Sequence, residues 1–353
     1  MLNIRNCDFS NLTLTTASNM YFITFYIFLP FYVTFGELFN IALLSALIGG
    51  SKSEGHYIYQ LFVVIAKTFE NLTFGLFLAG AYWFGGLAGD TASWFISNYT
   101  LMFVTMRVLS PLHFLAIYLS LFVSVAMTAD RVFALWRPFV YKNINHKLHR
   151  YTAMITCVVF STALSLDYYW YYNITQAAYS NHSHYVISPN KAYVGTTVAQ
   201  VLENIRAHIR LITVALLIIL NVVMVIMYKR RIRKLEQITG NNQEKSDARK
   251  EANTELLILN ICQSCLTCLD QIPHSAMQVI RHQSELWARC GLVLAPIADG
   301  AIMVSDAAEF FIVIAVNKRI RQSVAKVVAW NKMWSTLLKW RNRVVPMRTT
   351  TVQ

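Results

Sequence analysis

Where the third long apolar stretch of the chain ends, the sequence reads Asp130-Arg131-Val132-Phe133-Ala134-Leu135-Trp136-Arg137-Pro138-Phe139. The stretch before it, residues 99–127, is longer than the roughly 20 apolar residues that a helix needs to cross a bilayer. An arginine is costly inside the hydrocarbon layer, so the adjacent Asp130 and Arg131 are expected at its boundary. The segment therefore predicts the end of a membrane-spanning helix.

Further apolar windows of sufficient length lie on both sides of this one. They cover residues 26–47, 57–84, 151–171, 207–227, 256–280 and 292–316. The composition agrees with them: 56% of the residues are hydrophobic and 14% are charged, whereas soluble proteins average about 45–50% and about 25%. The sequence therefore predicts an all-α membrane protein, a bundle of seven transmembrane helices.

The basic residues predict how this bundle is oriented. The chain has 31 Lys and Arg against 18 Asp and Glu, a formal net charge of +13. Segments 51–56, 131–150, 229–255 and 318–353 together hold 23 of the 31 basic residues. Because cytoplasmic loops carry the excess of Lys and Arg, these segments are expected inside and the N-terminus outside the plasma membrane. A nucleic-acid partner is excluded, since no soluble basic domain remains to bind one.

The predicted organisation is an extracellular tail at 1–22, a bundle at 23–317 and a cytoplasmic tail at 318–353. Asn-x-Ser/Thr triplets support this orientation modestly, because those outside the apolar windows fall in the segments predicted to be extracellular. These glycosylation candidates are Asn11, Asn98, Asn173 and Asn181.

The segment quoted first resembles the D-R-Y-x-A-V-x-x-P-L signature of rhodopsin-like G-protein-coupled receptors. It matches at Asp130, Arg131, Ala134 and Pro138, with hydrophobic residues at most other positions. The resemblance implies a seven-helix receptor with a short amphipathic eighth helix, which binds an extracellular ligand, activates a heterotrimeric G protein and is not an enzyme. Within this class the chain looks like an invertebrate neuropeptide receptor of the FMRFamide-like branch or a nematode serpentine chemoreceptor.

The resemblance assigns the G-protein contact to Arg131, with Asp130 as its partner in the resting state. Pro138 belongs to the same loop, and Arg230 and Arg231 belong to a basic extension of the fifth helix that also faces the G protein. A purely topogenic role for these charges is the alternative interpretation.

A polar network is expected in the interior of the bundle, where the family has a sodium pocket. Its members by resemblance and helical spacing are Asn40, Glu70, Ser120, Asp306 and Glu309. Three carboxylates this close cannot all ionise without a cation, so either a bound sodium ion or protons must be present. No other cofactor and no metal is expected.

The usual switch residues are replaced in this chain. Gln271 stands where the family has tryptophan, and Val313 stands where it has tyrosine. A receptor-like protein that binds a ligand without coupling to a G protein therefore stays open as an alternative.

The ligand site is expected in the outer half of the bundle. Its candidate residues, found by counting helical turns from Arg131 and Pro273, are Arg107, His113, Tyr118, His274, Gln278 and Asp299. The position of His113 carries an aspartate in amine receptors, so an amine ligand is disfavoured. A peptide or a small polar or anionic molecule fits the histidines and the basic rim, in which Arg206 and Arg210 are included. Ordinary buried histidines are the alternative.

The cysteine pattern departs from that of the family, because the second predicted extracellular loop, 172–205, contains no cysteine. The family disulfide therefore cannot form, and a Cys7–Cys290 bridge is the candidate that the resemblance suggests. The loop itself is expected to be either a solvated, glycosylated segment or a lid over the ligand.

Charged residues inside the predicted spans raise a competing class, an ion-coupled transporter or a ligand-gated channel. Lys67, Glu70, Asp270, Asp306 and Glu309 are the residues concerned. Against this class, the chain shows no internal repeat.

Overall fold

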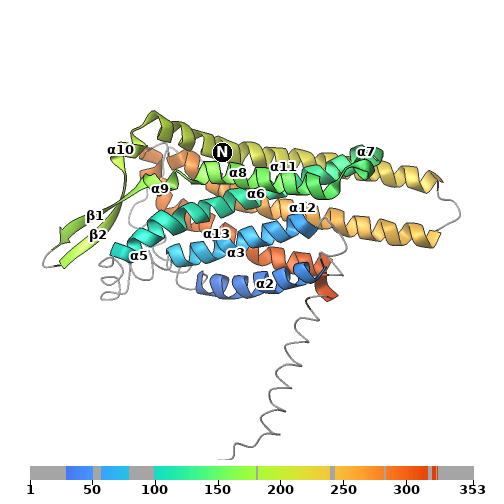
Figure 1. The fold of residues 1–353 in the computed structure, drawn as a ribbon, viewed down its shortest axis with the longest axis horizontal. Coiled ribbons are helices and arrows are strands. Elements are labelled where there is room, and N and C mark those ends of the chain that lie inside the picture. The colour runs from blue at the N-terminus through green and yellow to red at the C-terminus, as the bar shows by residue number, and fades with distance from the viewer. Residues whose placement is uncertain are drawn as a thin grey trace, which may run out of the picture.

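The computed structural model describes residues 29–50, 57–78, 99–179, 182–238, 243–281, 284–316, 320–322 and 324. Most of these residues are helical, and the longer helices lie side by side along one common direction (Figure 1). The elements, in chain order, are α2 (Leu29–Gly50), α3 (Tyr57–Leu78), α5 (Tyr99–Val104), η4 (Thr105–Leu109), α6 (Ser110–Trp136), α7 (Pro138–Asn143), α8 (His146–Ser165), α9 (Tyr168–Tyr171), β1 (Tyr172–Tyr179), β2 (His182–Pro189), α10 (Lys191–Val194), α11 (Thr197–Ile238), α12 (Gln243–Arg281) and α13 (Ser284–Val316).

The long helices form a closed arrangement. Contacts between neighbours run from α2 to α3, α6, α11, α12 and α13 and then back to α2. Helix α8 packs on the outside of this ring against α6 and α3. Helix α6 touches α3, α8, α11 and α12, so its side chains reach most of the interior. The prediction of a helical bundle is confirmed.

Many polar side chains are buried beside apolar ones inside the described bundle, and its outer surface is rich in exposed apolar side chains. Helix α11 shows this most clearly, because Arg206, Arg210 and Thr213 are buried while Ile212 and Ile219 are more than half exposed. Water-soluble proteins have the opposite distribution. By length and composition, the described helices Thr105–Trp136 and Thr197–Arg233 can cross a bilayer, and Val33–Ile48 is a shorter apolar helix.

The third predicted span contains a π-helical turn. Pro111 has no N–H, so the normal bond to the carbonyl four residues earlier cannot form there. The chain adopts η4 just before the proline, with the N–H of Ser110 bonded to the carbonyl of Thr105. One extra residue per turn rotates α5 relative to α6.

The signature segment is divided between two helices. Residues 130–136 continue α6, which ends because Arg137 precedes a proline and adopts φ −125° and ψ 66°. Pro138 then begins α7, where its fixed φ suits a first helical position. Helix α8 starts after Asn145, whose side chain accepts a hydrogen bond of 3.2 Å from the N–H of Leu148.

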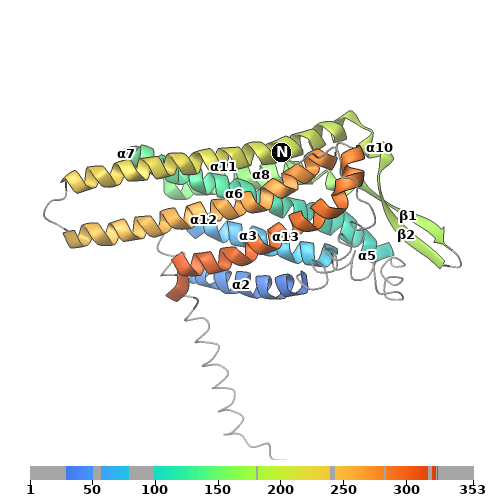
Figure 2. The same ribbon diagram turned by 180° about the vertical axis from the view of Figure 1, so that it is seen from behind.

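Two of the longer connections between the predicted spans contain regular secondary structure. Within residues 172–205, β1 and β2 pair as an antiparallel hairpin with Tyr172 opposite Pro189, and a role of this segment as a lid stays a prediction. In the connection 229–255, α11 extends to Ile238, which agrees with the predicted basic extension of the fifth helix, and α12 already begins at Gln243. Both extensions project beyond the bundle at the end that carries α7, opposite the hairpin (Figure 2).

Candidate functional site

The carboxylate of Asp130 is buried at the α7 end of α6. Its Oδ2 accepts a hydrogen bond of 2.9 Å from the hydroxyl of Tyr141 in α7, and its Oδ1 lies 3.5 Å from Nε2 of His149 in α8. Arg150 donates to the hydroxyl of Tyr141 at 3.2 Å. Burial, followed by the charge of Asp130, raises the pKa of Tyr141, so its phenol keeps the proton that it donates.

The expected resting pair of Asp130 with Arg131 is therefore not formed. Successive side chains on a helix diverge by about 100°, and Asp130 faces α7 and α8 whereas Arg131 faces α11. Among the described residues, Arg131 forms no ion pair. Its guanidinium is thus available to another partner.

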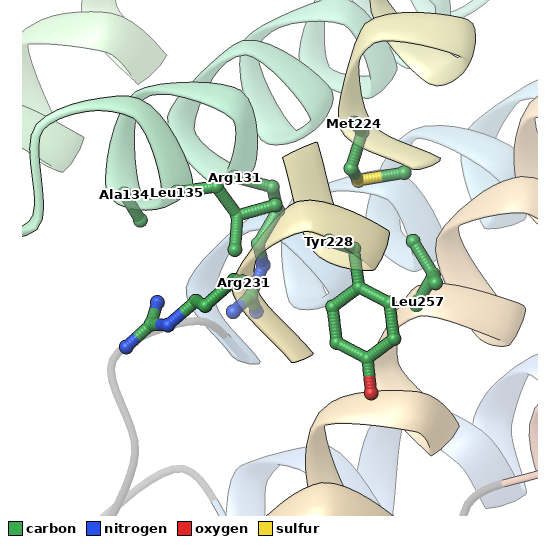
Figure 3. A pocket seen from close by; sticks show the side chains of 7 residues that line it. All are labelled: Arg131, Ala134, Leu135, Met224, Tyr228, Arg231 and Leu257. Atoms are coloured by element: carbon green, nitrogen blue, oxygen red, sulfur yellow. The ribbon is translucent and has the colours of Figure 1, made fainter. Parts of the chain in front are cut away.

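Arg131 lines an open cavity of about 110 Å³ between α6, α11 and α12. We call this the Arg131 cavity; its other lining residues are Ala134, Leu135, Met224, Tyr228, Arg231 and Leu257. Figure 3 shows Arg131 reaching from α6 toward the part of α11 that carries Tyr228 and Arg231. The cavity combines two guanidinium groups with an apolar floor.

A hydrogen bond joins two of the helices beside this cavity. The hydroxyl of Tyr228 in α11 lies 2.6 Å from that of Thr254 in α12. Of the other predicted coupling residues, Arg230 is exposed one position before Arg231, and Pro138 is exposed at the start of α7. The structure therefore brings Arg131 and Arg231 together in one cavity, whereas Arg230 and Pro138 are not among its lining residues.

The interior of the bundle contains an ion pair that the sequence did not predict. Nζ of Lys67 in α3 lies 2.7 Å from Oε2 of Glu309 in α13, and Gln263 of α12 donates to the other oxygen of Glu309 at 2.9 Å. All three side chains are at least nine-tenths buried. Lys67 thus gives Glu309 a positive charge at the place where the sequence predicted sodium or protons.

The remaining members of the predicted polar network are distributed along the interior. Asn40 and Glu70 are buried in α2 and α3, and the hydroxyl of Ser120 in α6 donates to the carbonyl of Ile117 at 2.9 Å. The side chain of Asp306 lies outside the described residues. A sodium ion among these side chains stays a prediction.

A second interhelical contact lies nearer the Arg131 cavity. The side-chain amide of Asn260 in α12 donates to the hydroxyl of Thr128 in α6 at 3.2 Å and to the amide oxygen of Asn221 in α11 at 3.4 Å. This bridge was missed because a single Asn in an apolar window has no pattern that identifies its partners.

The hairpin half of the bundle holds most of the predicted ligand residues. Nδ1 of His113 lies 3.4 Å from the hydroxyl oxygen of Thr73, and Nε2 of His274 lies 3.8 Å from Oδ1 of Asp299. The two imidazoles interact electrostatically with each other. The predicted grouping of His113, His274 and Asp299 from α6, α12 and α13 is thus consistent with their positions.

Arg210 of α11 enters the same group. It was expected at the rim, but its side chain is 1% exposed and its Cζ lies 4.9 Å from the ring centroid of Tyr118. Arg206, also expected at the rim, is buried against α9: its Nη1 lies 2.5 Å from Oδ1 of Asp167 and its Cζ 4.4 Å from the ring centroid of Tyr168. Tertiary packing therefore turns both rim arginines inward.

Arg107 does not join this group. It projects from η4, donates a hydrogen bond to the carbonyl of Tyr169 and lies 5.3 Å over that ring. The π-turn caused by Pro111 directs it to α9, so its contacts anchor the hairpin end. Its predicted contact with a ligand stays untested.

Several predicted residues lie outside the described part of the chain. These are Asn11, Asn98, Asn181 and Cys7, together with the side chains of Gln278 and Cys290. Asn173 is described and pairs with Ser188 in the hairpin. The described cysteines, Cys157, Cys262, Cys265 and Cys268, are free thiols. Among the described residues, no group of three or more His, Cys, Asp or Glu side chains is placed to hold a metal ion.

Comparison with known proteins identifies the family. A search of curated proteins finds no match. The family model described as "Serpentine type 7TM GPCR chemoreceptor Srx" matches residues 65–305, which is more than half of the chain. The match includes the signature segment, the Arg131 cavity and the ligand candidates from Arg107 to Asp299. The chain therefore belongs to the Srx family of serpentine seven-transmembrane G-protein-coupled chemoreceptors, a family of multi-pass membrane receptors and not of enzymes.

Proposed function

We propose that this receptor binds an extracellular ligand in the hairpin half of the bundle and activates a heterotrimeric G protein at the Arg131 cavity. The observation that carries the proposal is the division of the Asp130-Arg131 pair. Asp130 is held by Tyr141 and His149, while Arg131 faces an open cavity with Arg231. A guanidinium that lines an open cavity among apolar side chains suits a partner helix that presents a carbonyl terminus and apolar side chains.

The orientation that this proposal requires places the Arg131 cavity in the cytoplasm and the hairpin outside. The extensions of α11 and α12 project at the end that carries α7, and residues 229–255 hold eight Lys and Arg, which agrees with the positive-inside rule (Figure 1). Asn173 lies in the hairpin and is the described glycosylation candidate. If the hairpin is outside, Asn173→Gln will reduce the glycosidase-sensitive mass of the receptor expressed in cells.

The ligand that we propose is a peptide or a small polar or anionic molecule. His113, His274 and Asp299 offer hydrogen-bonding groups, and Arg210 adds a positive charge. The transporter alternative has less support, because the Lys67–Glu309 pair accounts for two of the intramembrane charges without an ion path. The family match also favours a receptor.

Basal guanine-nucleotide exchange tests the coupling step without knowledge of the ligand. Purified receptor in lipid nanodiscs is mixed with a panel of heterotrimeric G proteins, and Arg131→Ala is compared with Arg137→Ala. Arg137 is exposed, its Cζ lies 4.9 Å from the ring centroid of Trp136, and it is not among the residues that line the cavity. We expect exchange above the receptor-free rate for the wild type and Arg137→Ala, and its loss in Arg131→Ala. Equal exchange in both variants would contradict this role for Arg131, and no exchange with any G protein would favour a binder that does not couple.

A further inference from the structure

Arg210 has a buried guanidinium whose hydrogen-bonding capacity is unused. Its Nε and Nη2 atoms are buried and have no hydrogen-bond partner, although the side chain is 1% exposed. It forms no ion pair among the described residues, and its stabilising contact is the ring of Tyr118. A charged group in such a position is costly unless a counter-charge arrives from elsewhere.

Arg206, one helical turn earlier on α11, is a buried arginine whose guanidinium has protein partners and serves as a comparison for Arg210. It pairs with Asp167 at 2.5 Å, donates to the carbonyl of Leu164 at 3.5 Å and stacks on Tyr168. Both arginines are at least 98% buried. The same helix therefore provides one arginine with a resident carboxylate and another, Arg210, without one.

Two further polar groups near Arg210 are also unsatisfied. The hydroxyl of Tyr118 in α6 and Nδ1 of His274 in α12 are buried atoms without a hydrogen-bond partner. The ring of Tyr118 lies under the guanidinium, and His274 interacts electrostatically with Arg210. Helices α6, α11 and α12 thus bring three groups that can donate hydrogen bonds to one region of the interior.

The region lies far from the Arg131 cavity. Arg210 precedes Tyr228 by 18 residues on α11, and Tyr118 precedes Arg131 by 13 residues on α6. At a rise of about 1.5 Å per residue, these separations are about 27 Å and about 20 Å toward the hairpin. The unsatisfied groups are therefore on the ligand side of the bundle.

We propose that Arg210, Tyr118 and His274 bind a carboxylate group of the ligand. A carboxylate accepts two parallel hydrogen bonds from a guanidinium and still has lone pairs for a phenol and an imidazole. Oδ1 of Asp299 lies 3.8 Å from Nε2 of His274, so the site already has one acidic group of its own beside the imidazole. The inference rests on the proposed receptor function and narrows its ligand to acids.

A peptide with a free C-terminus and a small organic acid both carry this group, and a C-terminally amidated peptide does not. The test therefore compares acids with their amides. Full-length receptor in nanodiscs is melted in the presence of hexanoate, benzoate and phenylbutyrate, of the three corresponding amides, and of inorganic phosphate. A set of peptides in free-acid and amidated forms makes the same comparison for larger ligands.

We expect acids to raise the melting temperature and the matched amides and phosphate to have little effect. Arg210→Gln should weaken the apparent affinity for acids about 10- to 150-fold, which corresponds to the loss of a charged hydrogen bond. Arg210→Lys should retain part of the affinity, because it keeps the charge and loses the two-pronged geometry. His208→Gln is the matched control: His208 is exposed on the same helix, and its Nδ1 lies 2.7 Å from the carbonyl oxygen of Asn204.

The ligand-free melting temperature separates a binding role from a structural one. Because Arg210 lacks a resident partner, Arg210→Gln should melt at or above the temperature of the wild type without ligand. Equal stabilisation by acids and amides, undiminished acid binding by Arg210→Gln, or no stabilisation by any acid would each overturn the proposal. These measurements contain no G protein, so their failure is distinct from a failure of Arg131-dependent nucleotide exchange.

Discussion

The ammonium group of Lys67 lies 2.7 Å from the carboxylate of Glu309 in the interior of the bundle. The pair connects α3 to α13, two helices that are not neighbours in the ring of contacts described above. Gln263 adds α12 to the connection. A single buried ion pair thus ties three helices together, and its position gives it influence over any movement of one helix relative to another.

Removing one partner of this pair should be strongly destabilising. Lys67→Met leaves Glu309 with a buried charge and only the amide of Gln263, at a cost of about 3–5 kcal/mol. The double variant Lys67→Met/Glu309→Met should recover most of that loss, because neither charge then remains. Thermal unfolding of the three receptors in nanodiscs measures this coupling. If the destabilisation of the double variant equals the sum of the two single losses, the ion pair itself makes no contribution to the free energy of unfolding.

Sodium should raise the melting temperature of the Lys67→Met variant more than that of the wild type. Lys67 already supplies a cation to Glu309, so replacing sodium by choline should change the melting temperature of the wild type little. In Lys67→Met a sodium ion can compensate the carboxylates, and we expect sodium to raise its melting temperature by several degrees relative to choline. An equal response of both proteins would contradict this role for Lys67.

The hydroxyl of Tyr141 should keep Asp130 from pairing with Arg131, so that Arg131 can contact a G protein. In Tyr141→Phe the carboxylate of Asp130 loses its 2.9 Å hydrogen bond, and its neighbour Arg131 becomes the alternative partner. Basal nucleotide exchange should then fall about tenfold, a difference of about 1.4 kcal/mol. Tyr151→Phe, at an exposed position of α8, is the control and should behave as the wild type. An unchanged rate in Tyr141→Phe would show that Asp130 does not need the phenol.

The same hydrogen bond gives a pH prediction. Because burial and Asp130 raise the pKa of Tyr141 above its ordinary value of 10.0, the folded protein favours the protonated phenol. Its contribution to stability is fully present below pH 10.0 and is lost only as the pH rises through the raised value. Thermal unfolding between about pH 9 and pH 11 should therefore show a steeper loss for the wild type than for Tyr141→Phe; parallel curves would exclude this contribution.

Arg206 and Arg210 should respond oppositely to the same substitution. Arg206→Gln breaks the pair with Asp167 and leaves a buried carboxylate, so we expect a loss of about 3–5 kcal/mol in the free energy of unfolding. Arg206→Gln/Asp167→Asn should recover much of it. Arg210→Gln removes a charge without a resident partner and should cost nothing in the ligand-free receptor. Comparable destabilisation by both single variants would contradict the distinction that the contacts draw between the two arginines.

The sequence by itself determined the class of this protein. Apolar windows are a local property, so a helical membrane bundle could be predicted from composition and length alone. The Asp130–Phe139 segment is also local, and its spacing identified the receptor family and the end of the third long helix. The positive-inside rule counts residues and does not need their contacts, so the sequence also predicts which segments are inside and which are outside, and this orientation stays a prediction.

Only the tertiary structure decided which side chains meet. The partners of Lys67, Asp130 and Arg206 depend on the rotation of each helix about its own axis, and a change of one residue in register turns a side chain by about 100°. The π-turn before Pro111 shifts the register by one residue within a single apolar window. A count of regular helical turns back from Arg131 does not include this shift, so it misplaces residues such as Arg107. The rotation of α11 was likewise unknown, so Arg210 was predicted at the rim, whereas in the structure it is buried with its guanidinium over the ring of Tyr118. The local chemistry of a chain selects its fold, whereas the pairing of its buried charges is fixed only when the helices pack.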